Sequence, residues 1–334
     1  MSSSAPIEIA LFGAGRIGQI HAGNLARQTG VTLKYVVDVN AEAARALAAR
    51  FGAQVVGTEA ALADGAVRAV AIASSTDTHS DLIHRAAAAG KAIFCEKPVD
   101  LDLTRARACA AAVSKAGVAC HIGFQRRFDP TFAALKEKLV AGAIGDPEML
   151  VVTSRDPAPP PIPYIRSSGG IFSDMLIHDF DLCRWILDDD AVSVFAAGSC
   201  LVDPAIASAG DIDSTAVTIR TRRGRLCQIN TSRRAAYGYD QRFEVLGARG
   251  LLQAGNQRTT EVTVFDAAGV SGAKPEPFFL ERYRAAYAAE VAHFIEALKT
   301  NSVVRCTIDD AVKAQELAAA ATRSWKEGRV VTLA

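Results

Sequence analysis

The sequence predicts a chain of two domains, an α/β domain with a doubly wound parallel sheet and then an α+β domain with an open, mostly antiparallel sheet covered by helices on one face. With 334 residues, the chain is longer than one hydrophobic core usually organises. Up to about residue 124, short β-rich segments alternate with Ala-rich segments of helical period. Beyond that point, β-rich segments follow one another. We therefore expect domains at residues 1–124 and 125–334.

In the first domain, each expected strand is followed by an expected helix. The strands are predicted at residues 7–12, 33–37, 69–73, 92–95 and 118–123, and the helices at 17–28, 41–51, 78–89 and 103–116. Gly30, Gly52, Gly90 and Gly117 each follow a helical segment, where a left-handed cap favours a residue without a Cβ. This alternation predicts parallel pairing of the strands.

The second domain has a different pattern. It begins with a predicted helix at 130–141, a Pro-rich loop at 156–163 and then a further helix, and it ends with helices at about 281–299 and 308–326. Between them lie β-rich segments at 192–202, 214–220, 225–232, 241–246, 251–254 and 261–265. Short turns between these segments indicate antiparallel pairing, with one face of the sheet free for a partner.

The composition argues against several classes of protein. The 37 basic and 36 acidic residues leave a formal net charge of +1, so the net charge does not attract a nucleic acid or an anionic membrane. No segment has the apolar length of a membrane span, and the first residues lack the pattern of a signal peptide. We expect a cytoplasmic protein.

Seven cysteines are spread along the chain without a C-x-x-C pair that would indicate zinc or a redox couple. We expect most of them to be small buried side chains. Cys95 stands beside Glu96, and a neighbouring carboxylate raises the pKa of a thiol, so a catalytic thiolate is disfavoured there.

The segment Gly13-Ala14-Gly15-Arg16-Ile17-Gly18 directly follows the first expected strand and opens a helix. In this context a G-x-G-x-x-G motif is typical of the Rossmann dinucleotide-binding fold, in which the helix N-terminus faces a pyrophosphate. Asp38 ends the second expected strand, where a carboxylate accepts hydrogen bonds from an adenosine ribose and repels a 2′-phosphate. The motif therefore predicts NAD as cofactor, rather than NADP.

Other candidates for cofactor contacts lie at the carboxyl edge of the same sheet. Ser74, Thr76 and His79 follow the strand at 69–73, although capping of the next helix explains Thr76 or Asp77 equally well. For His21, one turn into the first helix, we favour packing or a local hydrogen bond over a cofactor contact.

Glu96-Lys97-Pro98 follows the strand at 92–95, at the edge where ligands bind. Alcohol oxidation with NAD requires a base for the hydroxyl proton and a cation or donor to stabilise the alkoxide. Lys97 can supply the cation near the nicotinamide, with Glu96 beside the cofactor. The proline stiffens the backbone and can adopt a cis peptide bond.

Asp174 and His178 follow the double glycine at 169–170 and are four residues apart, which on one helix places them within hydrogen-bonding reach. A carboxylate that holds an imidazole fixes its tautomer and increases its basicity, so His178 is the candidate base and Asp174 its orienter or a second substrate contact. Metal binding with Asp179 and Asp181 is a rival interpretation that we disfavour, because these two point elsewhere on a helix. We therefore predict no metal site. A helix cap with a core histidine is the simplest alternative.

The chain resembles the glucose-fructose oxidoreductase/inositol dehydrogenase/rhizopine-catabolism (Gfo/Idh/MocA) superfamily in several motifs. They are G-x-G-x-x-G with Asp38, the E-K-P tripeptide, the D-x-x-x-H motif and the segment Gly123-Phe124-Gln125-Arg126-Arg127-Phe128-Asp129-Pro130. The resemblance spans nearly the whole chain. Finer features at residues 154–157, 168–181, 237–242 and 279–283 resemble its inositol 2-dehydrogenase branch.

This resemblance implies NAD-dependent oxidation of the axial hydroxyl of myo-inositol to scyllo-inosose, with Lys97, Asp174 and His178 as the catalytic triad. It also implies polyol contacts by Arg127, Asp156 and Tyr237, whose guanidinium, carboxylate and phenol can bind several hydroxyls. As alternatives, Arg127 could be a structural ion-pair partner and Tyr237 a hairpin residue. The family further implies a homotetramer that forms through the free face of the second sheet.

Two other functions remain compatible with these residues. A dehydrogenase for another inositol stereoisomer or a pyranose sugar would use the same triad with a differently shaped rim. A non-catalytic dinucleotide-binding sensor would keep the fold, but it would have no need of the acid/base set.

Overall fold

The computed structural model describes residues 5–333, which belong to two compact units. The first unit comprises residues 1–128 and 286–313, and the second comprises 129–285 and 314–334. The division at residue 124 that we predicted follows chain order, whereas residues 286–313 pack in the first unit. The physical reason is that apolar side chains of this segment, Val291, Phe294 and Ile295 among them, share a core with Leu11 and Phe94.

The first unit contains a six-stranded sheet with the order β3-β2-β1-β4-β5-β6. Its strands are β1 (Ile7–Phe12), β2 (Val31–Val37), β3 (Gln54–Val55), β4 (Val67–Ile72), β5 (Ala92–Glu96) and β6 (Cys120–Gly123). All neighbours pair in parallel, so the predicted doubly wound sheet is confirmed. The strand order reverses between β1 and β4, and in such sheets ligands bind beside this reversal, at the carboxyl ends of the strands.

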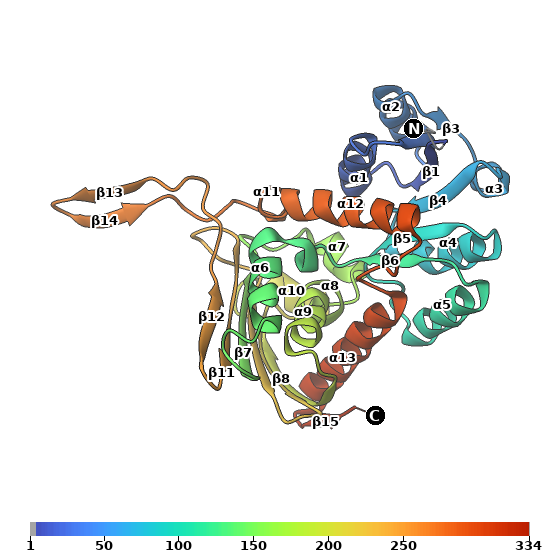
Figure 1. Cartoon of the computed structure of the whole chain (residues 1–334). Coiled ribbons are helices and arrows are strands. Elements are labelled where there is room, and N and C mark those ends of the chain that lie inside the picture. Colours follow the sequence, from blue (N-terminus) through green and yellow to red (C-terminus); the bar gives the residue numbers. More distant parts are fainter. Residues whose placement is uncertain (1–4, 334) are drawn as a thin grey trace. The chain divides into compact units, whose positions relative to one another are not determined.

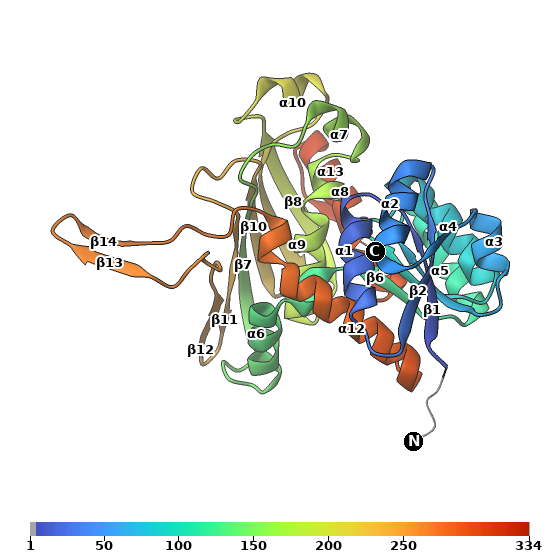
Figure 2. The ribbon, with the colours of Figure 1, turned by 90° about the horizontal axis from the view of Figure 1, so that it is seen from above.

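Helices cover both faces of this sheet (Figure 2). They are α1 (Arg16–Ala26), α2 (Ala41–Phe51), α3 (Thr58–Ala63), α4 (Thr76–Ala88), α5 (Leu103–Ala116) and α12 (Arg284–Thr300), with a short 3₁₀ helix η1 (Gln125–Phe128) after β6. Helices α1, α2 and α12 share one core with β1 and β2, and α4 packs against α5 on the other face. The predicted left-handed glycines 30, 52, 90 and 117 all have positive φ.

The second unit contains a seven-stranded sheet with the order β12-β11-β7-β10-β9-β8-β15. Its strands are β7 (Pro147–Arg155), β8 (Ala191–Ser199), β9 (Ser214–Thr221), β10 (Leu226–Ser232), β11 (Asp240–Gly247), β12 (Gly250–Ala254) and β15 (Val331–Thr332). The sheet is antiparallel except where β7 and β10 pair in parallel. A mostly antiparallel sheet was predicted, but its interior strand β7 was not.

Helices cover one face of this second sheet, as predicted (Figures 1 and 2). The helices of this unit are α6 (Pro130–Val140), α7 (Ile162–Ser167), α8 (Ile171–Asp174), α9 (Ile177–Leu187), α10 (Pro204–Ser208), α11 (Phe279–Arg282) and α13 (Ile308–Glu327), whose first turns belong to the first unit. Helix α9 packs on β7 and α6 on β12. Within residues 5–333, no helix is long and apolar enough to cross a membrane.

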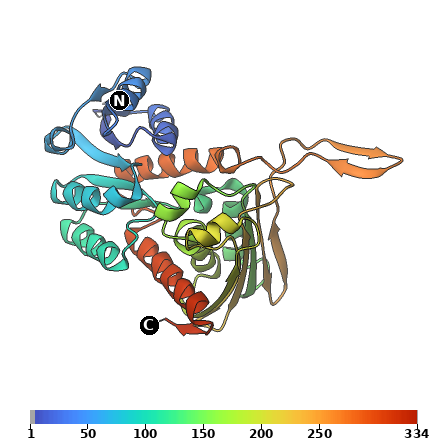
Figure 3. The ribbon, with the colours of Figure 1, turned by 180° about the vertical axis from the view of Figure 1, so that it is seen from behind.

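A hairpin of β13 (Thr263–Asp266) and β14 (Gly269–Gly272) projects from the second unit as an arm (Figures 1 and 3). Every residue of both strands is exposed, including the apolar Val264, Phe265 and Val270. A lone two-stranded ribbon is marginally stable in water. Packing against the core of the second unit therefore does not account for the stability of the arm.

Candidate active site

The Gly-rich turn lies between β1 and α1. Gly13 has φ +102°, and a Cβ there would lie 2.4 Å from the carbonyl oxygen of Ala73 on the neighbouring chain segment. A Cβ at Gly18 would lie 2.0 Å from the carbonyl oxygen of Gly13. A Cβ at Gly15, by contrast, would meet no atom of residues 5–333 within 4 Å. Two glycines thus permit the backbone to fold, and the third leaves open space at the N-terminus of α1.

This open N-terminus fits a phosphate group. Helix α1 begins at Arg16, followed by Ile17, and its first turn has no acidic residue. Gly15 and Arg16 are exposed. The backbone N–H groups of a first helical turn have no intrahelical acceptor and bind anions well. The geometry therefore suits the pyrophosphate of a dinucleotide.

Asp38 follows β2 directly, as predicted, and its carboxylate is tied to the same turn. Its Oδ2 accepts a hydrogen bond from the Ala14 N–H at 2.6 Å, and its Oδ1 accepts one from the Asn40 N–H at 2.7 Å. Each carboxylate oxygen can accept more than one hydrogen bond, so both keep capacity for ribose hydroxyls. Asp38 is thus beside the Gly-rich turn, and its contact with an adenosine ribose stays a prediction.

His79 bridges the chain segments that follow β4 and β5. It is buried, with Nδ1 2.7 Å from the carbonyl oxygen of Pro98 and Nε2 3.2 Å from that of Ser74. The Lys97-Pro98 peptide bond is cis. His79 thus holds the backbone next to Lys97, and its predicted direct contact with a cofactor stays a prediction.

The start of α4 also differs from our expectation. Its N-cap is Ser75, so Thr76 is the first helical residue and neither Thr76 nor Asp77 is the cap. The hydroxyl of Ser74 forms a 2.6 Å hydrogen bond with that of Thr78, one turn into the helix. Ser74 and Thr76 lie at the carboxyl end of β4, where we expected them.

Glu96 lies at the end of β5 and contacts the first helix. Its Oε1 is 2.7 Å from Nε2 of His21, which is fully buried against the ring of Phe94. A Cβ at Gly123 would lie 2.9 Å from Oε2 of Glu96, so this glycine makes room for the carboxylate. His21 was predicted to pack or to form a local hydrogen bond, and its partner Glu96 is 75 residues away in the sequence. This bond links the Gly-rich helix to the Glu96-Lys97-Pro98 segment.

In the second unit, Asp174 is bound on both sides. Its Oδ1 accepts a hydrogen bond from the Tyr164 hydroxyl at 2.7 Å, and its Oδ2 lies 3.4 Å from Nη2 of Arg233. Asp174 and His178 are partly exposed, whereas Asp179 and Asp181 are buried. The two residues of the predicted triad therefore present the more accessible polar groups of this segment.

The helix predicted to carry both residues is in fact two helices. Asp174 is the last residue of α8, and His178 is the second residue of α9. Between them, the N–H of Leu176 bonds to the carbonyl of Ile171, five residues back instead of four. This wider turn shifts the helical register, so the spacing of four residues does not by itself place Asp174 against His178.

Arg127 belongs to the first unit, where it is buried. Its Nη1 donates to the carbonyl oxygen of Arg305 at 3.0 Å, and its Nη2 lies 3.2 Å from Oδ1 of Asp310. These contacts agree with the alternative of a structural ion pair. A polyol contact by Arg127 stays a prediction.

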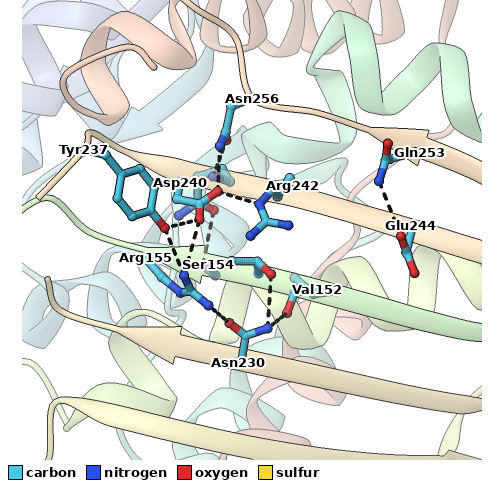
Figure 4. Close-up of polar contacts among 12 residues, drawn as sticks. Val152, Ser154, Arg155, Asn230, Tyr237, Asp240, Arg242, Glu244, Gln253 and Asn256 are labelled. Carbon is cyan, nitrogen blue, oxygen red and sulfur yellow. Dashed lines mark hydrogen bonds and ion pairs between the residues drawn. The ribbon is translucent and has the colours of Figure 1, made fainter. Parts of the chain in front are cut away.

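Asp156 and Tyr237 lie near the carboxyl end of β7 in the second unit. The Asp156 N–H bonds to the carbonyl of Ser232, at the end of the parallel strand β10. The Tyr237 hydroxyl donates to Oδ2 of Asp240 at 2.6 Å and accepts from Nη1 of Arg155 at 2.9 Å (Figure 4). Burial and this hydrogen bond to Asp240 raise the pKa of Tyr237. The phenol of Tyr237 is thus held by a polar network on the sheet.

Comparisons with known proteins decide the family. A model of an oxidoreductase family with an NAD-binding Rossmann fold matches residues 7–124, and a model of the C-terminal α/β domain of the same family matches residues 136–333. The chain belongs to the Gfo/Idh/MocA family. Its first unit is therefore an NAD-binding Rossmann domain, in agreement with the turn and the strand order described above.

Full-length relatives within the Gfo/Idh/MocA family are similar to this chain. It is 44% identical to the inositol 2-dehydrogenase of Rhizobium meliloti (strain 1021), over 98% of this chain and 99% of the relative. It is also 44% identical to the myo-inositol 2-dehydrogenase of Thermotoga maritima, over 98% of both chains. A crystal structure of myo-inositol dehydrogenase from Lactobacillus casei, in complex with NAD(H) and myo-inositol, is 28% identical with a TM-score of 0.88, covering 98% of this chain and 97% of that one.

The structure adds residues that the sequence analysis did not predict for this Gfo/Idh/MocA chain. Tyr164 and Arg233 contact Asp174 from positions 10 and 59 residues away, and Asp211 lies beside Arg233. A tyrosine just after a Pro-rich loop was a weak signal for Tyr164. The sequence carried no signal for Arg233, because its contact depends on the pairing of β10 in the sheet.

The structure also bears on the alternatives of thiol and metal chemistry. Six of the seven cysteines are buried, and desolvation by burial raises the pKa of Cys95 well above its ordinary value. Among residues 5–333, no group of three or more His, Cys, Asp or Glu side chains could hold a metal ion. A thiolate at Cys95 is therefore disfavoured on physical grounds.

Proposed function

We propose that this chain oxidises the axial hydroxyl of myo-inositol to the ketone scyllo-inosose with NAD. The observation that carries the proposal is a dinucleotide-binding turn with Asp38 beside it, in a chain 44% identical over nearly its full length to inositol 2-dehydrogenases. The partly exposed Asp174 and His178 supply acid/base groups, and Lys97 supplies a cation.

Each residue of the triad has a chemical part in this reaction. NAD, when bound, accepts the hydride from the carbinol carbon. His178 takes the hydroxyl proton, Lys97 stabilises the negative charge that develops on the alkoxide oxygen, and Asp174 orients the base or the substrate. Arg127, Asp156 and Tyr237 are proposed polyol contacts, with Tyr237 held in place by Asp240 and Arg155.

The direct test is the initial rate of NADH production from myo-, scyllo- and chiro-inositol and from glucose, with NAD and NADP in parallel at alkaline pH. We expect a clear preference for myo-inositol with NAD. A preference for another member of the panel would assign the chain to that polyol or sugar. Binding of NADH without turnover of any member would favour the sensor alternative.

The geometry of Asp38 predicts the selectivity for the cofactor. Replacing Asp38 by Ser should lower the ratio of kcat/KM with NAD to kcat/KM with NADP by about tenfold or more, because the carboxylate no longer repels a 2′-phosphate. The ratio is measured from initial rates at saturating polyol. Asp102→Ser is a matched control, since Asp102 also accepts a backbone N–H bond, from Thr104, but at the start of α5. An unchanged ratio in Asp38→Ser would contradict the role of Asp38.

We also propose that the chain assembles into a homotetramer through the open face of the second sheet. Phe195, Leu226, Leu246 and Leu251 are apolar side chains on exposed positions of its strands, and Leu246 pairs with Leu251 across two strands. Exposed apolar side chains gathered on one face are typical of a surface that another protein covers.

A charge on this face should weaken the assembly. Leu246→Glu should shift the mass measured by light scattering after gel filtration to smaller species, because association would bury an unpaired carboxylate. Leu201→Glu is the control, as Leu201 is exposed outside the strands of the sheet. A wild-type mass in Leu246→Glu would argue against this face as the interface.

A further inference from the structure

Asp174 lies between two side chains that none of the family motifs contains. The hydroxyl of Tyr164, on α7, is 2.7 Å from Oδ1, and Nη2 of Arg233, just after β10, is 3.4 Å from Oδ2. The two partners approach different oxygens of one carboxylate. A partial rotation of the carboxylate about its bond to Cβ would therefore lengthen at least one of these contacts.

Arg233 is almost completely buried and also faces a second carboxylate. Its side chain is 1% exposed, and Nη2 lies 3.7 Å from Oδ2 of Asp211. Oδ1 of Asp211 accepts the N–H of Ile171, the first residue of α8, and Gly170 leaves room for it because a Cβ there would lie 3.2 Å from this oxygen. Asp211 thus fixes the start of the short helix that ends at Asp174, and the guanidinium offsets both carboxylates. Of the two glycines before α8, Gly170 is thus the one that makes room for Asp211.

Tyr164 has a hydroxyl that stays protonated. Desolvation by burial, the charge of Asp174 and the hydrogen bond to Asp174 together raise the pKa of Tyr164, while the nearby Arg233 lowers it and Asp156 raises it slightly further. The neutral phenol is therefore a donor throughout the pH range of an assay. The residue as a whole is 48% exposed, whereas Arg233 is buried, so Tyr164 is the more accessible of the two partners of Asp174.

We propose that Tyr164 and Arg233 are positioning residues for the catalytic carboxylate of Asp174: Arg233 anchors one oxygen from the core, and Tyr164 fixes the other from the solvent side. Neither side chain needs to touch the reacting atoms. Together they hold the carboxylate of Asp174 in one orientation. A preorganised group lowers the activation barrier of the reaction more than a mobile one. This inference rests on the proposed function for its kinetic test.

The kinetic test compares Tyr164→Phe with wild type on the polyol that wild type oxidises best. We expect kcat to fall about tenfold, with KM for the polyol and the Kd for NADH within about twofold of wild type, because one hydrogen bond to a charged group is lost. Tyr35→Phe is the matched control, since the Tyr35 hydroxyl donates to Oδ2 of Asp64 at 2.9 Å in the first unit, and it should keep the wild-type kcat. A rise in KM with an unchanged kcat would make Tyr164 a polyol contact and overturn its positioning role.

Arg233 is tested with a graded pair of variants. Arg233→Met should lower kcat about 100-fold, because two neighbouring carboxylates lose their shared cation, and Arg233→Lys should recover part of that loss by restoring the charge. If Arg233→Met does not fold, the test uses Arg233→Lys alone. We expect this variant to have a reduced kcat and an unchanged Kd for NADH. Arg282→Lys, which alters a buried ion pair with Asp129 in the same unit, is the control for stability loss without loss of kcat. Wild-type kcat in Arg233→Lys and Arg233→Met would overturn the proposal for this residue.

A spectroscopic readout keeps this inference separate from the proposed function. The NMR signal of tyrosine labelled at Cζ reports the hydrogen bonding of each of the six phenols at neutral pH, and Tyr164→Phe assigns the signal of Tyr164. Asp174→Asn should shift the Cζ resonance of Tyr164, because the charged acceptor of its hydroxyl is removed. If wild type oxidises no polyol, the proposed function fails, yet this shift would still support the contact. If the Cζ resonance of Tyr164 does not respond to Asp174→Asn, the contact and the inference fail, whatever the activity.

Discussion

Replacement of Lys97 by Ala should lower kcat by about 10³-fold, while the Kd for NADH changes little. The variant removes the cation that stabilises the developing alkoxide. It should leave the loop in place, since the backbone at Pro98 is held by Nδ1 of His79 at 2.7 Å. The measurement is the initial rate with myo-inositol, together with NADH binding followed by fluorescence.

A second lysine in the same unit provides the control. Lys91 is buried, and its Nζ donates to the carbonyl oxygens of Asp64 and Val67 at 2.7 and 2.8 Å. Lys91→Ala should lower the Tm and leave kcat nearly unchanged, because its bonds join parts of the scaffold. If Lys97→Ala behaves like Lys91→Ala, Lys97 has no place in the mechanism.

His178→Asn should lower kcat by about 10²- to 10⁴-fold, the usual contribution of a positioned general base. An amide cannot accept the hydroxyl proton, although it keeps nearly the size and polarity of the imidazole. The acid limb of the rate profile, which reports protonation of the base, should also flatten. Both effects are read from kcat measured between acidic and alkaline pH.

His84→Asn tests whether the loss is specific to this histidine. His84 is half-buried on α4 of the first unit, away from the carboxyl edge of the sheet. We expect wild-type kcat and a wild-type rate profile for this variant. An acid limb that persists in His178→Asn would instead point to another base.

The alternating first domain could be predicted because its signals are local. Each helix there follows its strand within a few residues, and glycines such as Gly52 and Gly117 end the helices in the left-handed region. The position of Asp38 after β2 follows from the same local order. These features depend on spacing along the chain, which the sequence shows directly.

The missed elements have signals that compete with each other. In residues 147–155, the apolar segment Met149-Leu150-Val151-Val152 is a strand signal, but Pro147 and the following Pro-rich loop favour irregular structure. Pro161 and Pro163 indicate a loop, yet proline is also favoured at the start of a helix, and α7 begins at Ile162. For residues 147–155, pairing with the neighbouring strands β10 and β11 decides in favour of a strand.

The contacts around Asp174 could not be predicted for a different reason. Arg233 reaches Asp174 because β10, at whose end it lies, pairs in parallel with β7, and this pairing joins residues as far apart in the sequence as Met149 and Leu226. The break between α8 and α9 likewise depends on how Leu176 satisfies its N–H group. Long-range pairing and a single shifted hydrogen bond leave no periodic trace in a sequence.

The projecting arm constrains how the chain can be shortened. At its base, Arg258 pairs with Pro275, the Tyr239 N–H bonds to the carbonyl of Glu276, and a Cβ at Gly238 would lie 3.1 Å from the carbonyl oxygen of Pro275. The base of the arm is thus built into the loop that presents Tyr237. A truncation made for crystallisation or immobilisation should therefore remove only the outer strands at 263–272. The shortened chain should keep both Arg258 and Pro275, so that their pairing still supports the loop.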